Sequence, residues 1–261
     1  MKINKIYNEN CLDTMSRMED NFIDLTVTSP PYDNLRKYNG YSFDFESIAK
    51  ELYRVTKKGG VVVWVVGDAT LKGSESGNSF RQALYFMECG FNLHDTMIYS
   101  KNSVPLTHNR YEQDFEYMFV FSKCKPKTFN PILIDKIYKD NRINTSMKRD
   151  KNGNFSKGFR SDKKQKIKGN IWRYSVGGGI STKDKIAFKH PAIFPEKLAN
   201  DHILSWSNEG DLVYDCFMGS GTTAKMSILN KRNYIGSELS TEYCEIIKQR
   251  LNAQQKELFD D

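Results

Sequence analysis

The sequence predicts an α/β protein with a doubly wound, mostly parallel sheet and one inserted basic region. Apolar, strand-like runs at residues 23–28 and 61–66 are separated by a helix-like stretch, which is the order of βαβ units. The second run is apolar without alternation, as is typical of a strand covered on both faces. Residues 136–189 contain 16 Lys or Arg against 4 Asp or Glu, whereas the whole chain has a net charge of +7.

Composition limits the class of protein. With 261 residues, 39% of them hydrophobic, the chain can bury one substantial core and carry an appended region. It has no apolar run of membrane length and no signal-peptide pattern, so we expect a cytoplasmic protein without a membrane partner. The five cysteines and four histidines are scattered without ligand spacing, and we predict neither a disulfide framework nor a metal site.

Predicted strands and helices alternate along the first half of the chain. Strands are predicted over residues 5–7, 23–28, 61–66, 93–99 and 115–121, and helices over 12–18, 45–57 and 79–89. We expect Gly59 and Gly60 to end the second helix. In the third helix, the apolar residues at helical spacing are Phe80, Ala83, Leu84 and Met87. Only a loop separates the last two strands, which indicates an antiparallel pair at the sheet edge.

The last quarter of the chain completes the βαβ series. The predicted elements are a helix from Pro195, a strand at 211–215, a helix ending at Asn230, a strand at 233–238 and a helix over 241–251. Right-handed crossovers would place the carboxyl ends of strands 23–28 and 211–215 at the same edge of one sheet. Residues that follow these two strands would then share a crevice.

The tetrapeptide Ser29, Pro30, Pro31 and Tyr32 ends the second strand, because two prolines cannot continue a ladder. The prolines also fix the backbone and leave rigid carbonyl acceptors. The Ser29 hydroxyl and the Pro30 carbonyl suit the two hydrogens of a base's exocyclic amine, and Tyr32 suits stacking on a flipped base. A proline-terminated strand with a packed tyrosine fits these four residues equally well.

A second motif follows the strand at 211–215. Gly219 and Gly221 allow a tight turn and a close approach of the backbone to a ligand, and the helix start behind them favours a carboxylate. About 20 residues further on, Glu238 ends another strand, where nucleotide-binding α/β folds hold a ribose hydroxyl pair. Both features suit a nucleoside cofactor.

Together these stretches resemble the β-class amino-methyltransferases of DNA, which use S-adenosylmethionine and carry their catalytic motif before their cofactor motif. Residues 29–32 match the catalytic pattern and residues 215–222 the cofactor pattern, while residues 190–198 resemble the helix that lines the methionine end of the cofactor. The resemblance implies a Rossmann-like methyltransferase sheet of seven strands. It also implies double-stranded DNA as substrate and a possible cognate restriction endonuclease as partner.

The resemblance assigns roles residue by residue. The catalytic residues would be Ser29, Pro30, Pro31 and Tyr32. The cofactor-binding residues would be Asn10, Ser29, Phe194, Lys197, Asp215, Phe217, Gly219, Gly221, Thr222, Thr223 and Glu238. Asn10 is the one departure, since it stands where the family often has an Asp close to the cofactor adenine; an amide can still bond to an adenine edge.

Two stretches are candidates for DNA contact. Arg36, Lys37 and Tyr38 follow the catalytic motif and combine cations with an aromatic ring, although a plain solvated loop fits equally well. In the basic region, the candidates for phosphate or base contact are Arg149, Arg160 and Arg173. A solvated basic insertion is the alternative. We expect Trp172 and Tyr174 to anchor the returning chain rather than to read bases.

These assignments divide the chain into a catalytic half at 1–123, a basic target-recognition insertion at 124–189 and a cofactor-binding half at 190–261. The predicted reaction is direct transfer of a methyl group to the exocyclic amine of a flipped base. In this family a Ser at the first motif position goes mostly with N4 of cytosine, and N6 of adenine is the alternative. No cysteine has the Pro-Cys setting that methylation at carbon 5 of cytosine requires.

Two hypotheses from other classes remain open on the sequence alone. Gly219, Gly221 and Ala224 together with Glu238 also satisfy the dinucleotide fingerprint of an NAD-dependent oxidoreductase. That hypothesis does not explain the Ser29 motif or the basic region. A non-catalytic DNA-binding protein of methyltransferase ancestry would carry all of these motifs as well.

Overall fold

The computed structural model describes residues 1–31, 43–102, 109–136, 147–157 and 164–259. The chain forms two compact units. The larger one comprises Met1–Asn130 and Asn170–Asp261, and the smaller one is Pro131–Gly169. Within the described ranges, no helix combines the length and the apolar character that crossing a membrane requires.

The larger unit is built on a sheet whose eight described strands have the order β1-β14-β13-β2-β3-β7-β6-β12. The bounds are β1 (Lys5–Tyr7), β2 (Ile23–Thr28), β3 (Thr56–Val66), β6 (Asn92–Ser100), β7 (Phe115–Ser122), β12 (Ile171–Arg173), β13 (Leu212–Asp215) and β14 (Asn233–Ser237). All neighbours pair in parallel except β7, which is antiparallel to both β3 and β6. The mostly parallel sheet and the antiparallel pairing of β6 with β7 are confirmed. The pair does not form the sheet edge as predicted, because β12 pairs with β6 beyond it.

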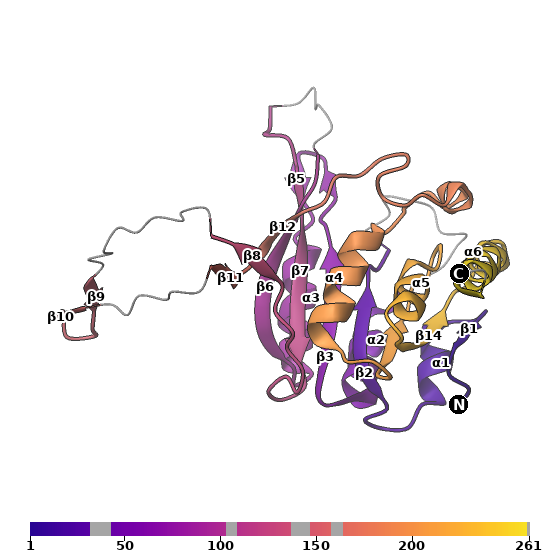
Figure 1. Ribbon diagram of the computed structural model, residues 1–261, viewed down its shortest axis with the longest axis horizontal. Helices are drawn as coiled ribbons and strands as arrows, with labels where there is room; N and C mark the ends of the chain where they lie inside the picture. Colours follow the sequence, from indigo (N-terminus) through magenta and orange to yellow (C-terminus); the bar gives the residue numbers. More distant parts are fainter. Residues whose placement is uncertain (32–42, 103–108, 137–146, 158–163, 260–261) are drawn as a thin grey trace. The chain divides into compact units, whose positions relative to one another are not determined.

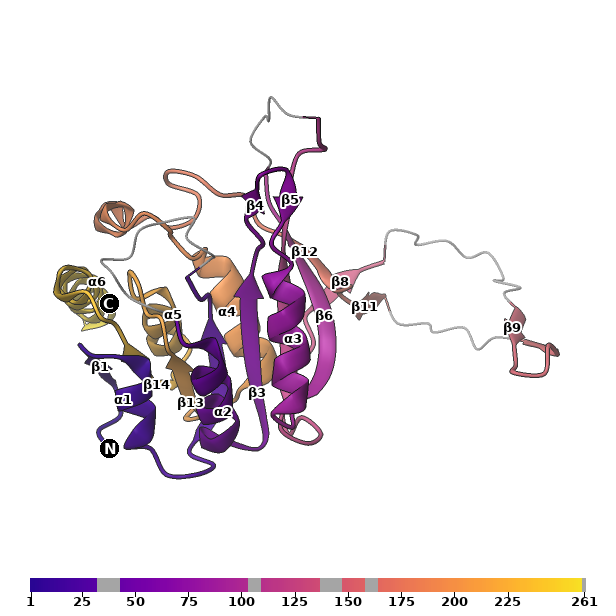
Figure 2. The ribbon, with the colours of Figure 1, turned by 180° about the vertical axis from the view of Figure 1, so that it is seen from behind.

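Helices cover both faces of this sheet, which confirms the doubly wound α/β class. Figure 1 shows α4 (Glu196–Trp206) and α5 (Thr222–Leu229) in front of the strands, with α6 (Thr241–Phe259) beside α5. Figure 2, seen from behind, shows α1 (Cys11–Ser16), α2 (Phe45–Val55) and α3 (Asn78–Glu88) on the opposite face. A short 3-10 helix, η1 (Lys185–Lys189), precedes α4.

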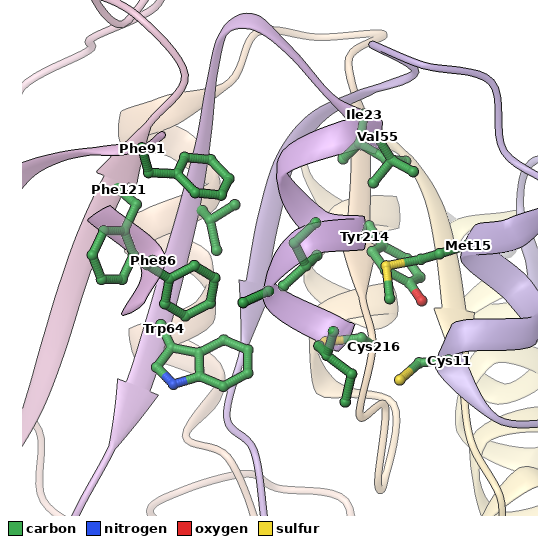
Figure 3. Close-up of a cluster of buried hydrophobic side chains, with 14 of the residues drawn as sticks. Cys11, Met15, Ile23, Val55, Trp64, Phe86, Phe91, Phe121, Tyr214 and Cys216 are labelled. Atoms are coloured by element: carbon green, nitrogen blue, oxygen red, sulfur yellow. The ribbon is translucent and has the colours of Figure 1, made fainter. Parts of the chain in front are cut away.

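The main core lies between the sheet and the helices α1, α2 and α3 (Figure 3). Its largest member is Trp64 of β3, which is fully buried and packs edge-on against Phe86 of α3 at 5.1 Å between ring centroids. The indole nitrogen donates to Gln82 Oε1 at 2.8 Å, so the buried ring leaves no orphaned donor. Burial of each such aromatic side chain stabilises the fold by about 1.5–3 kcal/mol.

The prediction that Gly59 and Gly60 end a helix is wrong. Helix α2 ends at Val55, and Thr56 is already extended with φ −71° and ψ 131°. Both glycines lie within β3, where a Cβ on Gly60 would come within 2.9 Å of the Asp24 carbonyl oxygen. The pair is needed because neighbouring backbone approaches this part of the strand closely.

Of the four apolar residues at helical spacing in α3, only Ala83 is buried, so this spacing does not mark the buried face. Phe80, Leu84 and Met87 are 50%, 61% and 45% exposed, whereas Ser79, Gln82, Ala83 and Phe86 are buried. Hydrogen bonds set this rotation: Ser79 donates to the buried Asp68 through its backbone N–H at 3.0 Å, and Gln82 accepts from Trp64. Asp68 therefore fixes the start of α3.

Strand β12 adds an eighth strand to the seven that the family resemblance implied. It pairs with β6, and Ile98 N–H donates to the Asn170 carbonyl at 2.9 Å. Trp172 and Tyr174 are each 5% exposed, which confirms that they anchor the chain in the larger unit. Three residues are too short a run to carry a strand pattern, and only pairing with an existing edge makes them a strand.

The smaller unit, Pro131–Gly169, lies inside the predicted insertion at 124–189, and residues 170–189 belong to the larger unit. Two antiparallel pairs are described in it, β8 (Leu133–Asp135) with β11 (Gln165–Ile167) and β9 (Met147–Arg149) with β10 (Phe155–Lys157). A further short hairpin, β4 (Thr70–Leu71) with β5 (Ser74–Glu75), belongs to the larger unit. The recognition role of the basic region stays a prediction.

Candidate active site

Strands β2 and β13 are parallel neighbours in the sheet, with Val213 opposite Leu25 and Tyr214 opposite Thr26. The two motif-bearing loops therefore leave the sheet at the same edge, as predicted. Parallel α/β sheets bind ligands at this carboxyl edge. A hydrogen bond joins the two strand ends, from Thr28 Oγ1 to Asp215 Oδ1 at 2.6 Å.

The predicted catalytic residues begin immediately after β2. Ser29 is half-buried, Pro30 is buried and Pro31 is half-buried. Neither proline has an N–H to donate to a neighbouring strand, and the ladder ends at Thr28. Tyr32 lies outside the described residues.

Asp215 is almost fully buried where β13 ends. Its Oδ1 accepts from Thr28 and from the Phe217 N–H, the latter at 3.0 Å. Burial raises the pKa of Asp215, and these hydrogen bonds together with one from Thr223 oppose the rise. In this structure Asp215 ties the start of the glycine loop to β2, and its contact with a cofactor stays a prediction.

The glycine loop connects β13 to α5. Gly219 and Gly221 have φ values of +54° and +84°, a region that favours glycine. A Cβ on Gly219 would come within 3.2 Å of His190 Nε2, and one on Gly221 within 2.9 Å of an Ile247 methyl group. Side chains at these two positions would therefore be strained as well as crowded.

Glu238 comes directly after β14 and faces the glycine loop. Its Oε2 accepts the Gly219 N–H at 2.8 Å, and its Oε1 accepts the Ser240 N–H, also at 2.8 Å. Burial raises the pKa of Glu238, against the effect of these two backbone donors. Each carboxylate oxygen keeps acceptor capacity for a further donor such as a ribose hydroxyl.

The other predicted loop residues pack inward. Thr223 Oγ1 donates to the Val27 carbonyl at 3.3 Å, which links α5 to β2. Thr222 is buried and its hydroxyl accepts from Arg250 at 3.3 Å. The Phe217 ring packs edge-on against Phe43, with ring centroids 5.7 Å apart. In the structure these three side chains position the loop.

The remaining predicted cofactor residues lie at the starts of α1 and α4. Asn10 caps α1, where its Oδ1 accepts the Leu12 N–H at 2.9 Å. Phe194 is half-buried just before α4. Lys197, in the first turn of α4, is exposed and forms an ion pair with Asp201 at 3.3 Å. Contact of these side chains with a cofactor stays a prediction.

The predicted DNA-binding residues are only partly described. Arg36, Lys37, Tyr38 and Arg160 lie outside the described residues. Arg149 is exposed on β9 of the smaller unit, with its guanidinium 5.7 Å from the centre of the Phe155 ring. Arg173 is exposed on β12 of the larger unit. No group of His, Cys, Asp and Glu in the described ranges is arranged to hold a metal ion.

Sequence reasoning assigned no individual role to three residues that shape this edge. His190 lies against Gly219, and Thr28 binds Asp215. Asn8, after β1, donates to the Glu238 and Leu239 carbonyls at 2.9 Å each, which holds the turn that carries Glu238. The partners of Thr28 and Asn8 are about 190 and 230 residues away, so no local spacing could reveal these bonds.

Comparisons with known proteins agree with this geometry. A family model described as DNA methylase matches residues 23–249. The orphan methyltransferase M.BamHII of Bacillus amyloliquefaciens is 63% identical over 235 residues, which cover 88% of each chain. The Type II methyltransferase M.BglII of Bacillus subtilis is 27% identical over 98% of this chain and 71% of its own.

Solved structures share the fold. A structure of PvuII DNA methyltransferase (cytosine-N4-specific) aligns with a TM-score of 0.69 at 21% identity, over 93% of this chain and 84% of its own. TTHA0409 of Thermus thermophilus, complexed with S-adenosyl-L-methionine, aligns with a TM-score of 0.65 at 20% identity, over 96% and 93%. The family match spans both motif loops and the sheet between them, and a relative is 63% identical. The chain therefore belongs to the N6/N4 amino-methyltransferase family of DNA methylases, and its motif order places it in the β class.

Proposed function

We propose that this DNA methylase transfers a methyl group from S-adenosylmethionine to N4 of a cytosine flipped out of double-stranded DNA. The observation that carries the proposal is the pairing of β2 with β13, because it brings the Ser29 motif and the glycine loop to one edge of the sheet. A base amine held by the first loop and a cofactor held by the second would meet there.

The choice of base rests on Ser29. A neutral hydroxyl at the first motif position goes mostly with cytosine in families of this type, and the structurally similar PvuII enzyme is described as cytosine-N4-specific. Adenine N6 is the second candidate, since a hydroxyl accepts hydrogen bonds from either amine. A cognate restriction endonuclease stays a prediction.

The glycine loop fits S-adenosylmethionine. Gly219 leaves room beside His190 that a Cβ would fill, and Glu238 presents carboxylate oxygens beside the same loop. Solved complexes of TTHA0409 and M1.HpyAVI with this cofactor share the fold. When bound, the cofactor supplies a methyl group already activated on a sulfonium. Gly219, Gly221 and Glu238 would hold it.

The residues after β2 position the base. The Ser29 hydroxyl and the Pro30 carbonyl accept the two amine hydrogens, which directs the nitrogen lone pair away from them and toward the glycine loop. The prolines keep these acceptors rigid, so little ordering is needed when the base arrives. The proton that the amine loses leaves along the hydrogen bond to Ser29 toward solvent, because a neutral hydroxyl is a poor final base.

Covalent catalysis through the Cys216 thiol is disfavoured. Cys216 is buried at the start of the glycine loop, and burial raises the pKa of its thiol well above the ordinary value. The thiolate is the reactive form of cysteine, so this side chain is a poor nucleophile at neutral pH. Direct transfer to the amine fits these surroundings better.

The test is incubation of the protein with unmethylated DNA and labelled S-adenosylmethionine, followed by nucleoside mass analysis. We expect labelled N4-methylcytosine. Labelled N6-methyladenine would retain the mechanism and overturn the assignment of the base. Absence of label from every nucleoside, with the cofactor bound, would contradict the proposed reaction and favour the non-catalytic DNA-binding alternative.

A further inference from the structure

A cluster of four charged residues, two of them buried and two half-buried, lies behind the glycine loop. Arg250 of α6 is fully buried, and Lys225 of α5 is 9% exposed. Asp184 precedes η1, and Glu196 begins α4; their side chains are 27% and 20% exposed. Glu196 lies within residues 190–198, which resemble the family's cofactor-lining helix, whereas the other three residues belong to no motif that suggested the function. Asp184 and Arg250, the first and last of the four, are 66 positions apart.

The Arg250 guanidinium joins three segments of the chain. Its Nε donates to Asp184 Oδ2 at 2.9 Å, and one terminal nitrogen donates to Glu196 Oε1 at 2.8 Å. The other terminal nitrogen donates to the Ser220 carbonyl oxygen of the glycine loop at 2.5 Å. Arginine suits this role because its donors lie in one rigid plane and diverge in fixed directions.

Lys225 completes the cluster from the first helix after the loop. Its Nζ donates to Asp184 Oδ2 and to Glu196 Oε1 at 2.9 Å each, and Glu196 Oε1 also accepts from Thr182 Oγ1 at 2.6 Å. Two cations therefore face two carboxylates. Burial acts to raise the pKa of Asp184, but the bonds from Lys225 and Arg250 outweigh it and hold the pKa below the ordinary value.

Stability alone does not explain this cluster. Desolvation of buried charges offsets much of their attraction, and well-packed apolar residues often serve as well. The cluster does, however, connect two segments that the proposed function places around one ligand: the glycine loop and the stretch leading into α4. Figure 1 shows α4, α5 and α6 together on the same face of the sheet.

We propose that Arg250 is a positioning residue for S-adenosylmethionine: it sets the distance between the glycine loop and the start of α4, with Lys225 balancing the charge. Arg250 acts through the Ser220 carbonyl and does not touch the cofactor. The inference rests on the proposed function, since it assumes that the loop binds this cofactor.

The experiment compares Arg250→Lys with Arg232→Lys. Lysine keeps the positive charge but cannot hold three acceptors in one plane. Arg232 is a matched control because it is also buried and donates to the Ser207 carbonyl at 2.6 Å and the Asn230 carbonyl at 2.6 Å. Arg232 directly precedes the first residue of β14, whereas Glu238 follows the last residue of the same strand. Cofactor affinity is measured by calorimetry on the full chain, together with thermal unfolding and the KM values for cofactor and DNA.

We expect Arg250→Lys to raise the Kd for S-adenosylmethionine at least tenfold, and to raise the KM for the cofactor while the KM for DNA changes little. Arg232→Lys should shift the melting temperature about as much as Arg250→Lys does, but its Kd for S-adenosylmethionine should stay within about twofold of the wild-type value. A Kd that is unchanged in Arg250→Lys, or that rises equally in both variants, would overturn the inference.

Failure of the proposed function and misfolding of the variant can each be distinguished from failure of the inference about Arg250. Failure of the wild-type chain to bind the cofactor would contradict the proposed function itself, before any variant is compared. If Arg250→Lys does not unfold cooperatively, Glu196→Gln takes its place, because it removes one charge of the cluster and keeps an acceptor. We expect a threefold or larger rise in Kd there, and an unchanged Kd would overturn the inference.

Discussion

Ser29 carries the hydroxyl on which the proposed chemistry depends. We expect Ser29→Ala to lower kcat by about 10- to 100-fold, which corresponds to about 1.4–2.7 kcal/mol, because the amine loses one of its two acceptors. Cofactor affinity should change less than about threefold, since the glycine loop is intact. Single-turnover kinetics and calorimetry would measure the two effects.

Ser29→Thr is the matched control, since it keeps the hydroxyl at the same half-buried position. It should retain more activity than Ser29→Ala. Full activity in Ser29→Ala would contradict the role of the hydroxyl as an acceptor.

Glu238 predicts a pH dependence of cofactor binding. Burial raises the pKa of this carboxyl above its ordinary value of 4.5, so it gains a proton at a higher pH than an exposed glutamate does. Protonation removes the charge that would accept ribose hydroxyls. We expect the affinity for S-adenosylmethionine to fall as the pH drops through this raised pKa, as measured by calorimetry.

Glu238→Gln distinguishes the effect of the Glu238 carboxyl from that of Asp215, because burial raises the pKa of Asp215 as well. The variant should bind S-adenosylmethionine more weakly at neutral pH, and its affinity should lose the pH dependence that is due to Glu238. If the affinity for S-adenosylmethionine changes with pH by the same amount in wild type and variant, another group is responsible for the dependence.

At the scale of elements, the return of the chain along β12 depends on a buried tyrosine. Tyr174 Oη donates to Asp201 Oδ2 at 2.6 Å, which links the end of β12 to α4. We expect Tyr174→Phe to reduce the free energy of unfolding by about 1.5–3 kcal/mol, since a buried carboxylate loses a donor. Thermal unfolding should show a melting temperature lower by about 3–10 °C.

Tyr99 provides the control for Tyr174. Its ring lies 6.1 Å from that of Tyr174, and its buried hydroxyl has no hydrogen-bond partner among the described residues. Tyr99→Phe should therefore change the free energy of unfolding by less than about 0.5 kcal/mol or increase it. Equal losses in the two variants would contradict the assigned role of the Asp201 bond.

Helix α3 shows what local pattern can and cannot predict. Its presence near residues 79–89 followed from apolar spacing, but the exposed side chains of Phe80 and Leu84 show that this spacing did not identify the buried face. Bonds from Trp64 to Gln82 and from Ser79 to Asp68 set the rotation. Such polar partners come from other elements, and a helical periodicity contains no information about them.

At the scale of the whole molecule, the smaller unit can be tested by removal. Leu133 pairs with Ile167 across the antiparallel strands β8 and β11, so these two positions are about 5 Å apart. Residues 134–166 can be replaced by a two-residue turn. We expect cofactor affinity to be retained, while DNA affinity falls at least tenfold with a weaker salt dependence, because basic residues are lost.

Fluorescence anisotropy at several salt concentrations would measure DNA affinity. Unchanged DNA binding in the shortened chain would contradict the recognition role predicted for the basic region. Loss of cofactor binding would contradict the expectation that the larger unit binds S-adenosylmethionine without the smaller unit.

The sequence by itself determined the α/β class, the two motif loops and their order, because each depends on short stretches of backbone chemistry: prolines that end a strand, glycines that permit positive φ, and apolar runs that form covered strands. The family followed from the same stretches. The positions of Ser29 and Glu238, each next to a strand end, were predictable for that reason.

Only the tertiary structure decided which distant residues meet. The addition of β12 to the sheet edge, the hydrogen bond of Asp215 with Thr28, the placement of His190 beside Gly219 and the Arg250 cluster each join segments remote in sequence. Side chains of this kind have no periodicity of their own. Their partners are chosen by strand order and helix packing, which arise from the free energy of the whole core rather than from any local run of residues.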